Sequence, residues 1–375
     1  MAGIYIHIPF CKQACHYCDF HFSTNTSLKA PMLQAIAKEL RIRKKYMGTA
    51  QVKSIYLGGG TPSLLEATAL ETLLTLITQH FSLSDVMEIT LEANPDDITL
   101  TKLQALKAIG INRLSIGVQS FQDSVLRHLN RMHDSQKAIA SVELARKAGF
   151  DNLSIDLMYA IPGTGHAMWE ANLATALQLQ PEHIAAYCLT IEKNTVFGRW
   201  HERGKLKAVK DEVAARQFET LVEVLEMHHY EHYEVSNFSR PGCHAQHNTN
   251  YWKQGQYLGV GPGAHSYDGD TRQCNVEHNQ RYIDSLQRSV VPCTVEVLTR
   301  IDHINEYVMT SLRTQWGCDI AWLKAQYGHT LEQTKSTYLK QLIDHKLAVI
   351  NGQKLLLTRQ GKLLADQIAM NLFVD

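Results

Sequence analysis

The sequence predicts an α/β fold: a partial (β/α)6 barrel followed by a C-terminal winged-helix-like α+β domain. Six short apolar runs alternate with segments of helical period over residues 1–190. Alternation of this kind favours parallel strands joined by right-handed crossovers. Six units fit a partial barrel better than a full eight-unit barrel, with a doubly wound open sheet as the alternative. The third observation is a final segment, 300–375, whose pattern is helices around a hairpin.

The six expected strands are apolar runs, several of them rich in β-branched residues, bounded by Gly, Pro, Asn or Asp, as buried strands are. They are Gly3–Ile8, Lys53–Leu57, Glu88–Leu91, Arg113–Val118, Asn152–Leu157 and His183–Leu189. Between them apolar residues recur with a period of about 3.6 residues. The expected helices are Met32–Tyr46, Leu64–His80, Thr101–Ile109, Ser135–Ala148 and Met168–Leu179. Gly110 and Gly149 stand where helix C-caps belong.

We assign residues 1–235 to the barrel, which ends with an amphipathic helix over Glu212–Met227. Residues 236–299 form a connecting segment. The stretch Tyr230–Tyr267 is rich in aromatic residues, His and Gly and has little periodicity. A loop of that length is usually functional or disordered, and its aromatic content argues against disorder.

The C-terminal domain, 300–375, is expected to contain three helices, a hairpin and a closing helix. The expected elements are helices Asn305–Leu312, Ile320–Ala325, Leu331–His345 and Gly361–Phe373, and strands Ala348–Ile350 and Lys354–Leu357. Asn351-Gly352 between the two strands is a type I′ turn signal. Winged helices often bind DNA, but this segment has no excess of Lys and Arg, so we expect it to pack against protein.

Composition excludes several classes of protein. The chain has 375 residues, 45% of them apolar, and 37 basic against 37 acidic side chains. Zero formal charge without a long basic run argues against binding of nucleic acid. No run of 18 or more apolar residues occurs, and no basic residue precedes the short apolar run of Met1–Phe10. We therefore expect a soluble cytoplasmic protein without a signal peptide.

Three of the eight cysteines are clustered as Cys11-x3-Cys15-x2-Cys18, directly after the first expected strand. Three thiolates so close can coordinate three irons of a [4Fe–4S] cluster and leave the fourth iron open. The alternative is zinc, which normally takes four protein ligands, with His16 or His21 completing the site. A disulfide would leave one of the three cysteines over.

Further polar groups stand where other expected strands end. Gly58-Gly59-Gly60-Thr61-Pro62 follows the second strand, and Glu92, Gln119 and Asp156 lie at the ends of the next three. In βα barrels such residues build the active site. The glycines permit close backbone approach to a ligand, or else form only a tight turn.

The cysteine spacing, with Tyr17 just before the third cysteine, resembles the signature of radical S-adenosylmethionine enzymes. In that family the amino and carboxylate groups of S-adenosylmethionine chelate the open iron, and electron transfer produces a 5′-deoxyadenosyl radical. The resemblance implies a [4Fe–4S] cluster on the three cysteines, bound S-adenosylmethionine and a partial (β/α)6 radical-SAM barrel. This agrees with the strand count above.

"GVQSFQDSVLRHLNRMH" at 117–133, "DLMYAIPGTG" at 156–165 and "HNTNYW" at 247–252 are similar to one group of that family, the HemN/HemW group of coproporphyrinogen III dehydrogenases and haem chaperones. The similarity extends over nearly the whole chain. It implies residues that contact S-adenosylmethionine: Tyr5, Tyr17, Gly59, Gly60, Thr61, Glu92, Gln119, Arg131 and Asp156. Arg131 suits its carboxylate and Asp156 its ribose hydroxyls. Without the motifs, Arg131 would be interpreted as a helix cap and Asp156 as a turn residue.

Three features resemble the haem chaperone branch. Phe20 stands where the dehydrogenases carry a further cysteine, and the chain begins almost at the first strand, without their N-terminal extension. The motif His247-Asn248-x-x-Tyr251-Trp252 resembles the haem-associated motif of the chaperones, in which imidazole can ligate iron while aromatic rings pack on the macrocycle. Other candidate ligands for haem iron are His228, His229, His232, His244 and His265.

The resemblance implies a haem chaperone, without coproporphyrinogen oxidase activity, that delivers haem to acceptor haemoproteins such as respiratory enzymes. Membrane contact would be peripheral and through those acceptors. Two alternatives stay open at this point. One is oxygen-independent oxidation of coproporphyrinogen III by S-adenosylmethionine radical chemistry, and the other is a structural zinc protein on a βα barrel.

Overall fold

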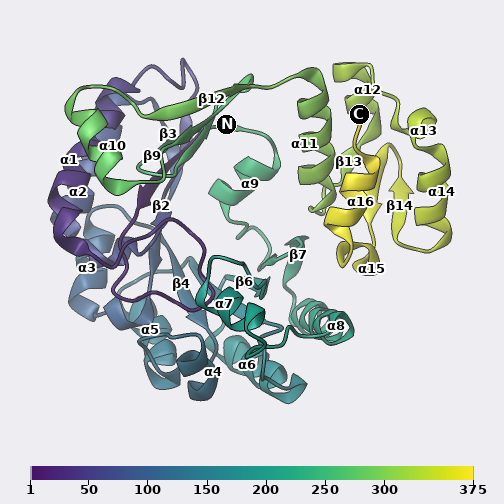
Figure 1. The fold of residues 1–375 in the computed structure, drawn as a ribbon, viewed down its shortest axis with the longest axis horizontal. Helices are drawn as coiled ribbons and strands as arrows, with labels where there is room; N and C mark the ends of the chain where they lie inside the picture. The colour runs from purple at the N-terminus through teal and green to yellow at the C-terminus, as the bar shows by residue number, and fades with distance from the viewer. Residues whose placement is uncertain (1, 375) are drawn as a thin grey trace.

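The computed structural model describes residues 2–374 and has a large open sheet at its centre (Figure 1). Six parallel strands lie side by side in chain order: β1 (Ala2–Ile8), β2 (Val52–Gly59), β3 (Leu83–Ala93), β4 (Arg113–Gln119), β5 (Leu153–Tyr159) and β6 (His183–Cys188). This confirms the predicted partial barrel. In a doubly wound sheet the strand order reverses midway, so the sequential order is against that alternative.

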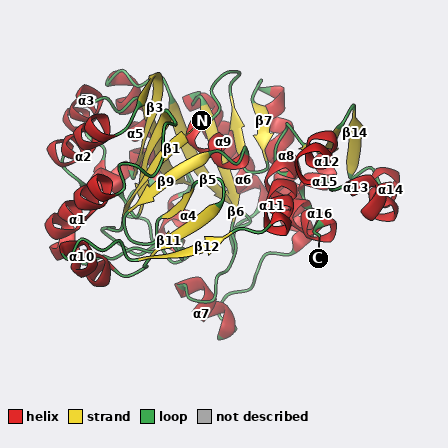
Figure 2. Cartoon of the chain, turned by 90° about the horizontal axis from the view of Figure 1, so that it is seen from above, coloured by secondary structure: helices red, strands yellow, loops and turns green. Residues whose placement is uncertain are grey.

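The helices that connect these strands cover the outer face of the sheet (Figure 2). The five expected ones are present within a few residues: α1 (Lys29–Ile42), α2 (Ala67–His80), α3 (Leu100–Ala108), α5 (Ser135–Lys147) and α6 (His166–Leu179). The expected helix after β6 is α8 (Asp211–Met227). Short elements escaped the periodicity argument because one or two turns show no period: η1 (Thr26–Leu28), η2 (Pro62–Leu64), η3 (Pro95–Asp97), α4 (Asp123–His128) and α7 (Val196–Glu202).

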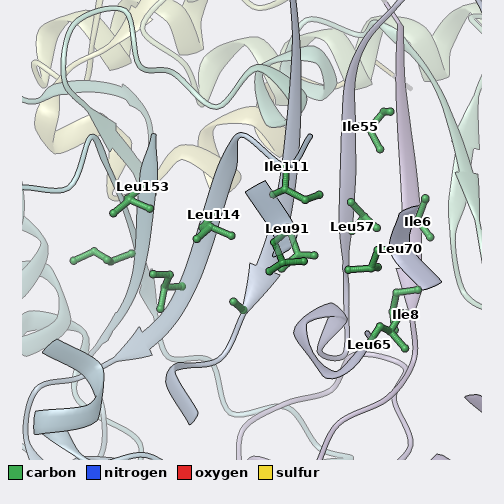
Figure 3. Close-up of a cluster of buried hydrophobic side chains, with 14 of the residues drawn as sticks. Ile6, Ile8, Ile55, Leu57, Leu65, Leu70, Leu91, Ile111, Leu114 and Leu153 are labelled. Carbon is green, nitrogen blue, oxygen red and sulfur yellow. The ribbon is translucent and has the colours of Figure 1, made fainter. Parts of the chain in front are cut away.

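Side chains of the barrel strands alternate between two environments, as strand geometry requires. On β1, Ile6 and Ile8 point outward and pack near Leu57, Leu65 and Leu70, where Figure 3 shows them as part of one apolar layer. The alternate residues face the barrel interior and are mostly polar. They include Tyr5, His7, Ser54, Tyr56, Glu88, Thr90, Arg113, Ser115, Ser154 and His183. Burial of the outward face holds the barrel together, which leaves the inward face available for chemistry.

The prediction of a loop over Tyr230–Tyr267 is wrong, because residues 230–299 form regular elements. They contain β7 (Glu231–Glu234), β8 (Asn237–Ser239), α9 (Gln246–Trp252), β9 (Gln256–Val260), β10 (His265–Tyr267), β11 (Thr271–Asn275), α10 (Asn279–Gln287) and β12 (Cys293–Val297). β8 pairs with β6 at one edge of the sheet, and β9 pairs parallel with β1 at the other. Strands of three to five residues carry too few alternations to be detected. The segment expected to be a connector thus extends the sheet at both edges.

The last part of the chain packs around its own apolar core and a small sheet of order β13-β15-β14. Its elements are α11 (Arg300–Leu312), β13 (Cys318–Asp319), α12 (Ile320–Tyr327), α13 (Leu331–Thr334), α14 (Ser336–Asp344), β14 (Ala348–Asn351), β15 (Lys354–Leu357), α15 (Arg359–Lys362) and α16 (Ala365–Leu372). The expected hairpin is present. The two longest expected helices are each divided, at Lys335 and near Leu364, where the backbone leaves the helical region. Within residues 2–374, no helix combines the length and apolar character that a bilayer-spanning segment needs.

Candidate functional site

A cavity of about 470 Å³ lies at the carboxyl ends of the barrel strands, and we call it the cysteine cavity. The structure brings together there most of the residues singled out for the cluster and for S-adenosylmethionine. They are Cys11, Cys15, Tyr17, Cys18, Gly59, Gly60, Thr61, Glu92, Gln119, Arg131 and Asp156. Tyr5 is the exception, because it lines a second cavity described below.

The cysteine loop is held by donors that point at its sulfur atoms. Thr61 Oγ1 donates to Cys11 Sγ over 3.3 Å, and Arg131 Nη1 donates to Cys15 Sγ over 3.4 Å. Burial raises the pKa of Cys11 to about 11 and that of Cys18 to about 12. Thiolates at these positions therefore need positive charge beside them, which bound iron supplies.

The zinc alternative finds little support in the geometry. Among the described residues, no group of three His, Cys, Asp or Glu is arranged to hold one metal ion. The two proposed extra ligands are engaged elsewhere: His16 Nδ1 with the carbonyl oxygen of His128, and His21 Nε2 with Asn279 Oδ1. In a cubane cluster each cysteine binds a different iron, so the three thiols need not converge on one point.

Glu92 is a half-buried residue near the end of β3. It accepts hydrogen bonds from the Tyr56 hydroxyl over 2.8 Å and from the backbone N–H of Gly59 over 3.1 Å. Burial raises its pKa to about 7, with the nearby Asp156 carboxylate acting in the same direction against those two hydrogen bonds. A cation such as an ammonium group would stabilise the ionised form, so Glu92 is suited to bind one.

Asp156, on β5, lies two residues beyond the register level of Glu92 and accepts from Ser115 Oγ over 3.0 Å. Burial raises its pKa to about 6, against the Ser115 hydrogen bond and the guanidinium groups of Arg113 and Arg131. Its second carboxylate oxygen is available as an acceptor for hydroxyl groups. The structure therefore gives Asp156 a place in the cavity wall rather than in a turn.

Backbone conformation changes abruptly where β4 and β5 end. Gln119 has φ of 63° and Ala160 has φ of 55°, a region that residues other than glycine rarely adopt. Such strain persists where surrounding structure enforces it, and it is common at functional sites. The turn carries the Gln119 side chain into the cavity wall.

The glycines after β2 are required by packing against β1. Gly59 has φ of 107°, and a Cβ there would lie 2.6 Å from the ring of His7. A Cβ on Gly60 would lie 2.7 Å from the carbonyl oxygen of Phe10. The close approach of β1 and the cysteine loop to β2 is thus a second reason for these glycines, besides the access that they give a ligand to the backbone. The sequence did not indicate this packing reason.

Arg131 reaches the cavity from the segment after α4, so it is not a simple helix cap. Its Nη2 donates to Asn94 Oδ1 and, over 2.8 Å, to the Gly117 carbonyl oxygen. Asn94 Nδ2 donates in turn to Thr61 Oγ1, which links Arg131 to the donor on Cys11. Asn94 was not singled out from the sequence, although a polar residue after a strand and before Pro95 was a usable signal.

A second cavity, of about 640 Å³, lies beside the first, and we call it the aromatic cavity. Its wall combines β1, the cysteine loop, the segment 251–277 and helix α11. The wall includes Tyr5, His7, Phe20, His21, Tyr251, Trp252, Tyr257, His265, Tyr267, Arg272 and Met309. Asp19 and Phe20 line both cavities, and Phe20 is 70% exposed at this junction.

The HNTNYW motif forms helix α9, which is inserted against the interior of the barrel. Glu88 on β3 accepts from the backbone N–H groups of Gln246 and His247 at the start of this helix. Tyr251 and Trp252 line the aromatic cavity, whereas Asn248 is half-buried and lines neither cavity. The motif is therefore held in place by strand residues far away in the sequence.

His247 is 1% exposed, and both of its ring nitrogens are engaged. Nδ1 lies 2.9 Å from Ser54 Oγ, and Nε2 lies 2.7 Å from the Tyr251 hydroxyl. The ring stacks on Tyr56, and burial lowers its pKa to about 3, so the imidazole is neutral. Four of the five rival histidines, His228, His229, His232 and His244, do not line the aromatic cavity, but His265 does.

Comparison with known proteins agrees with this architecture. A family model of the radical SAM superfamily matches residues 5–175, and one of the HemN C-terminal domain matches residues 298–364. The Heme chaperone HemW of Bacillus subtilis (strain 168) is 37% identical over 372 residues, which cover 98% of this chain and 98% of that protein. The Heme chaperone HemW of Mycobacterium tuberculosis (strain ATCC 25618 / H37Rv) is 35% identical over 99% of this chain and 94% of that protein.

Among solved structures, the coproporphyrinogen III oxidase HemN from Escherichia coli matches with a TM-score of 0.86 over 100% of this chain and 90% of that chain. Its sequence identity is 24%, so this likeness concerns the fold. The similarity to the HemW proteins is more specific, because it extends over nearly the full length of this chain at 35–37% identity. The chain belongs to the radical SAM superfamily and, within it, to the HemW family.

Proposed function

We propose that the protein is a haem chaperone that binds a [4Fe–4S] cluster, S-adenosylmethionine and haem, and delivers haem to acceptor haemoproteins such as respiratory enzymes. The observation that carries this proposal is the pair of adjoining cavities, one lined by three cysteines and the other by aromatic and histidine side chains. None of the eight cysteines in the described chain forms a disulfide, in keeping with work in the reducing cytoplasm.

Cys11, Cys15 and Cys18 would hold the cluster. The donors on two of their sulfur atoms, Thr61 and Arg131, fit this role because hydrogen bonds to sulfur and nearby positive charge stabilise thiolate ligands. When bound, such a cluster supplies an electron and an open iron position. The protein's share is to bind, orient and exclude side reactions.

S-adenosylmethionine would lie between the cysteine loop and the strand ends. Its ammonium group suits Glu92, its carboxylate suits Arg131, and its ribose hydroxyls suit Asp156. Gly59, Gly60, Thr61, Gln119 and Tyr17 would complete the wall around it. The partial burial of both carboxyl groups supports this assignment, because a carboxyl shielded from water gains more from a cationic or hydroxyl partner than an exposed one does.

Haem would occupy the aromatic cavity. Its volume of about 640 Å³ and its tyrosine-rich wall suit a flat macrocycle, which packs well on aromatic rings. Tyr251 and Trp252 of the HNTNYW helix contribute to that wall directly. His247 does not line the cavity, but its Nε2 is hydrogen-bonded to the Tyr251 hydroxyl. Tyr5 lines this wall as well, and its contact with S-adenosylmethionine stays a prediction.

Transfer of haem tests the proposal. Anaerobically reconstituted protein should bind about one haem per chain and then lose it to an apo-haemoprotein such as apomyoglobin, followed by the growth of the acceptor's Soret band. A buffer control with free haem sets the uncatalysed rate. Haem that never binds, or that binds without transfer to any acceptor tried, would refute the chaperone function.

A further inference from the structure

We propose that Tyr251, and not His247, coordinates the haem iron, with His247 as the hydrogen-bond partner of the ligating oxygen. This inference rests on the proposed function, because it names the iron ligand within the haem site. The observation that carries it is the hydrogen-bonded series Tyr251–His247–Ser54, which runs from the wall of the aromatic cavity into the barrel.

Direct ligation by His247 conflicts with its surroundings. Its ring is enclosed between Ser54, Tyr56 and Gly3, and a Cβ on Gly3 would come within 3.0 Å of it. Nδ1 and Nε2 are both within 2.9 Å of hydroxyl oxygens. An axial bond from His247 to iron would require the loss of one of these hydrogen bonds and movement of helix α9 away from β1 and β2.

Tyr251 lies one helical turn after His247, so both side chains share one face of α9. Phenolate is an established axial ligand of ferric haem. A neutral phenol is a poor ligand, so the phenol loses its proton as the bond to iron forms. His247 Nε2, 2.7 Å from the Tyr251 oxygen, fixes the position of that oxygen, and Ser54 Oγ holds the other ring nitrogen of the imidazole.

The step balances without any change of oxidation state. The O–H bond of Tyr251 and the bond between Fe(III) and the hydroxide that ferric haem carries in water both break, an O–Fe(III) bond forms, and the proton and the hydroxide leave together as water. The imidazole stays neutral, and its Nε2–H tautomer can donate to the phenolate while Nδ1 accepts from Ser54 Oγ. Tryptophan at the next position, Trp252, contributes aromatic surface for the macrocycle in the same wall.

Tyr5 is the nearest rival, since its hydroxyl lies 3.1 Å from His7 Nδ1 and it lines the same cavity. His7 Nε2 donates to the carbonyl oxygen of His21, which fixes the ring in place. The longer Tyr5 hydrogen bond and the rigid strand position favour Tyr251. Tyr5→Phe therefore serves as the matched control, because it also removes one phenolic oxygen from the aromatic cavity.

The test is titration of ferric haem into reconstituted protein, followed by absorption, electron paramagnetic resonance and resonance Raman spectra. The parent should give high-spin ferric haem with a phenolate-to-iron charge-transfer band. Tyr251→Phe should abolish that band and weaken haem binding about tenfold or more. Tyr5→Phe and His265→Ala should retain it. His247→Gln should shift the band and weaken binding while leaving the phenolate signature detectable.

A variant-free readout covers the case in which Tyr251→Phe folds poorly. Ring-deuterated tyrosine incorporated into the parent should shift the Raman modes enhanced by excitation in the charge-transfer band. A parent spectrum of imidazole-ligated haem, without tyrosine modes, would overturn Tyr251 as the ligand. Retention of the charge-transfer band in Tyr251→Phe would also overturn Tyr251 as the ligand. In both cases the parent would still bind haem, so the chaperone proposal would be unaffected. Failure of the parent to bind haem at all would instead refute the proposed function.

Discussion

The cysteine cavity and the aromatic cavity share Asp19 and Phe20, yet they are built in different ways. The cysteine cavity is formed by the carboxyl ends of consecutive parallel strands. Its residues therefore lie at similar places in successive strand–helix units of the sequence. The aromatic cavity uses β1, a loop, helix α9, an antiparallel extension and α11, which are far apart in the sequence. A site of the first kind can be predicted from the sequence, whereas a site of the second kind can be identified only once the three-dimensional structure is known.

This difference predicts that the two cavities can be disabled separately, and the largest expected effect concerns the cluster. Cys15→Ser should abolish the visible absorption of the cluster after anaerobic reconstitution, because three thiolates share one cluster. Ferric haem should still bind, since the aromatic cavity contains none of the three cysteines. Both are measured in one absorption titration.

Cys293→Ser is the matched control, because Cys293 lies on β12 away from both cavities. It should retain cluster and haem. A full cluster in Cys15→Ser would contradict the assignment of the three cysteines.

The second prediction concerns the strand ends. Asp156→Ala removes an acceptor from the wall of the cysteine cavity. Hydrogen bonds that involve a charged group contribute about 1.5–3 kcal/mol, so affinity for S-adenosylmethionine should fall about 10- to 150-fold. The cluster should be unchanged. Anaerobic calorimetry measures both the parent and the variant. Asp211→Ala, on the exposed start of α8, is the control, and equal affinity in Asp156→Ala and the parent would remove Asp156 from the site.

The third prediction uses the pKa of Glu92, which burial raises to about 7. A carboxyl with a raised pKa is neutral at low pH, and its ionised form, which attracts an ammonium group, becomes dominant as pH rises through about 7. Since about a tenth of the group is ionised one pH unit below its pKa, affinity for S-adenosylmethionine should be about tenfold weaker at pH 6 than at pH 8.

Glu92→Gln should lose most of that pH dependence and bind weakly at both values. The ligand's own amino group titrates equally in both proteins, so the comparison isolates Glu92. The same pH dependence in Glu92→Gln would show that another group is responsible.

The smallest expected effect concerns Trp252. Trp252→Ala should weaken haem binding about threefold to tenfold through lost aromatic packing, without altering the ligand field of the iron. Trp322→Ala, on α12 and outside the aromatic cavity, should have no effect. A change in the spin state of the iron in Trp252→Ala would contradict this role and show that the indole affects the iron ligands.

The sequence was sufficient for the six barrel units, because each strand and helix is long enough to show its period. It also sufficed to single out Cys11, Glu92 and Asp156, because chemically distinctive residues interrupt apolar patterns there. The cavity that Tyr5 lines could not be predicted, for the opposite reason: a tyrosine on a strand reveals neither the cavity it faces nor its hydrogen-bond partner.

The segment 230–299 shows the same limit more broadly. Its strands are held by pairing with β1 and β6, and α9 is fixed by the Glu88 carboxylate, none of which is encoded locally. Likewise the enclosure of His247 depends on Gly3 and Ser54, which lie on strands at the other end of the chain. Tertiary contacts of this kind cannot be inferred from spacing.

The central claim is that this chain carries haem and does not oxidise a porphyrinogen. The most direct test is incubation of the reconstituted protein with coproporphyrinogen III, S-adenosylmethionine and a reductant under anaerobic conditions, with haem bound in a parallel sample. The account predicts no conversion of coproporphyrinogen, and transfer of the bound haem to an acceptor in the parallel sample. Steady formation of protoporphyrinogen would contradict it, whatever the affinity for haem.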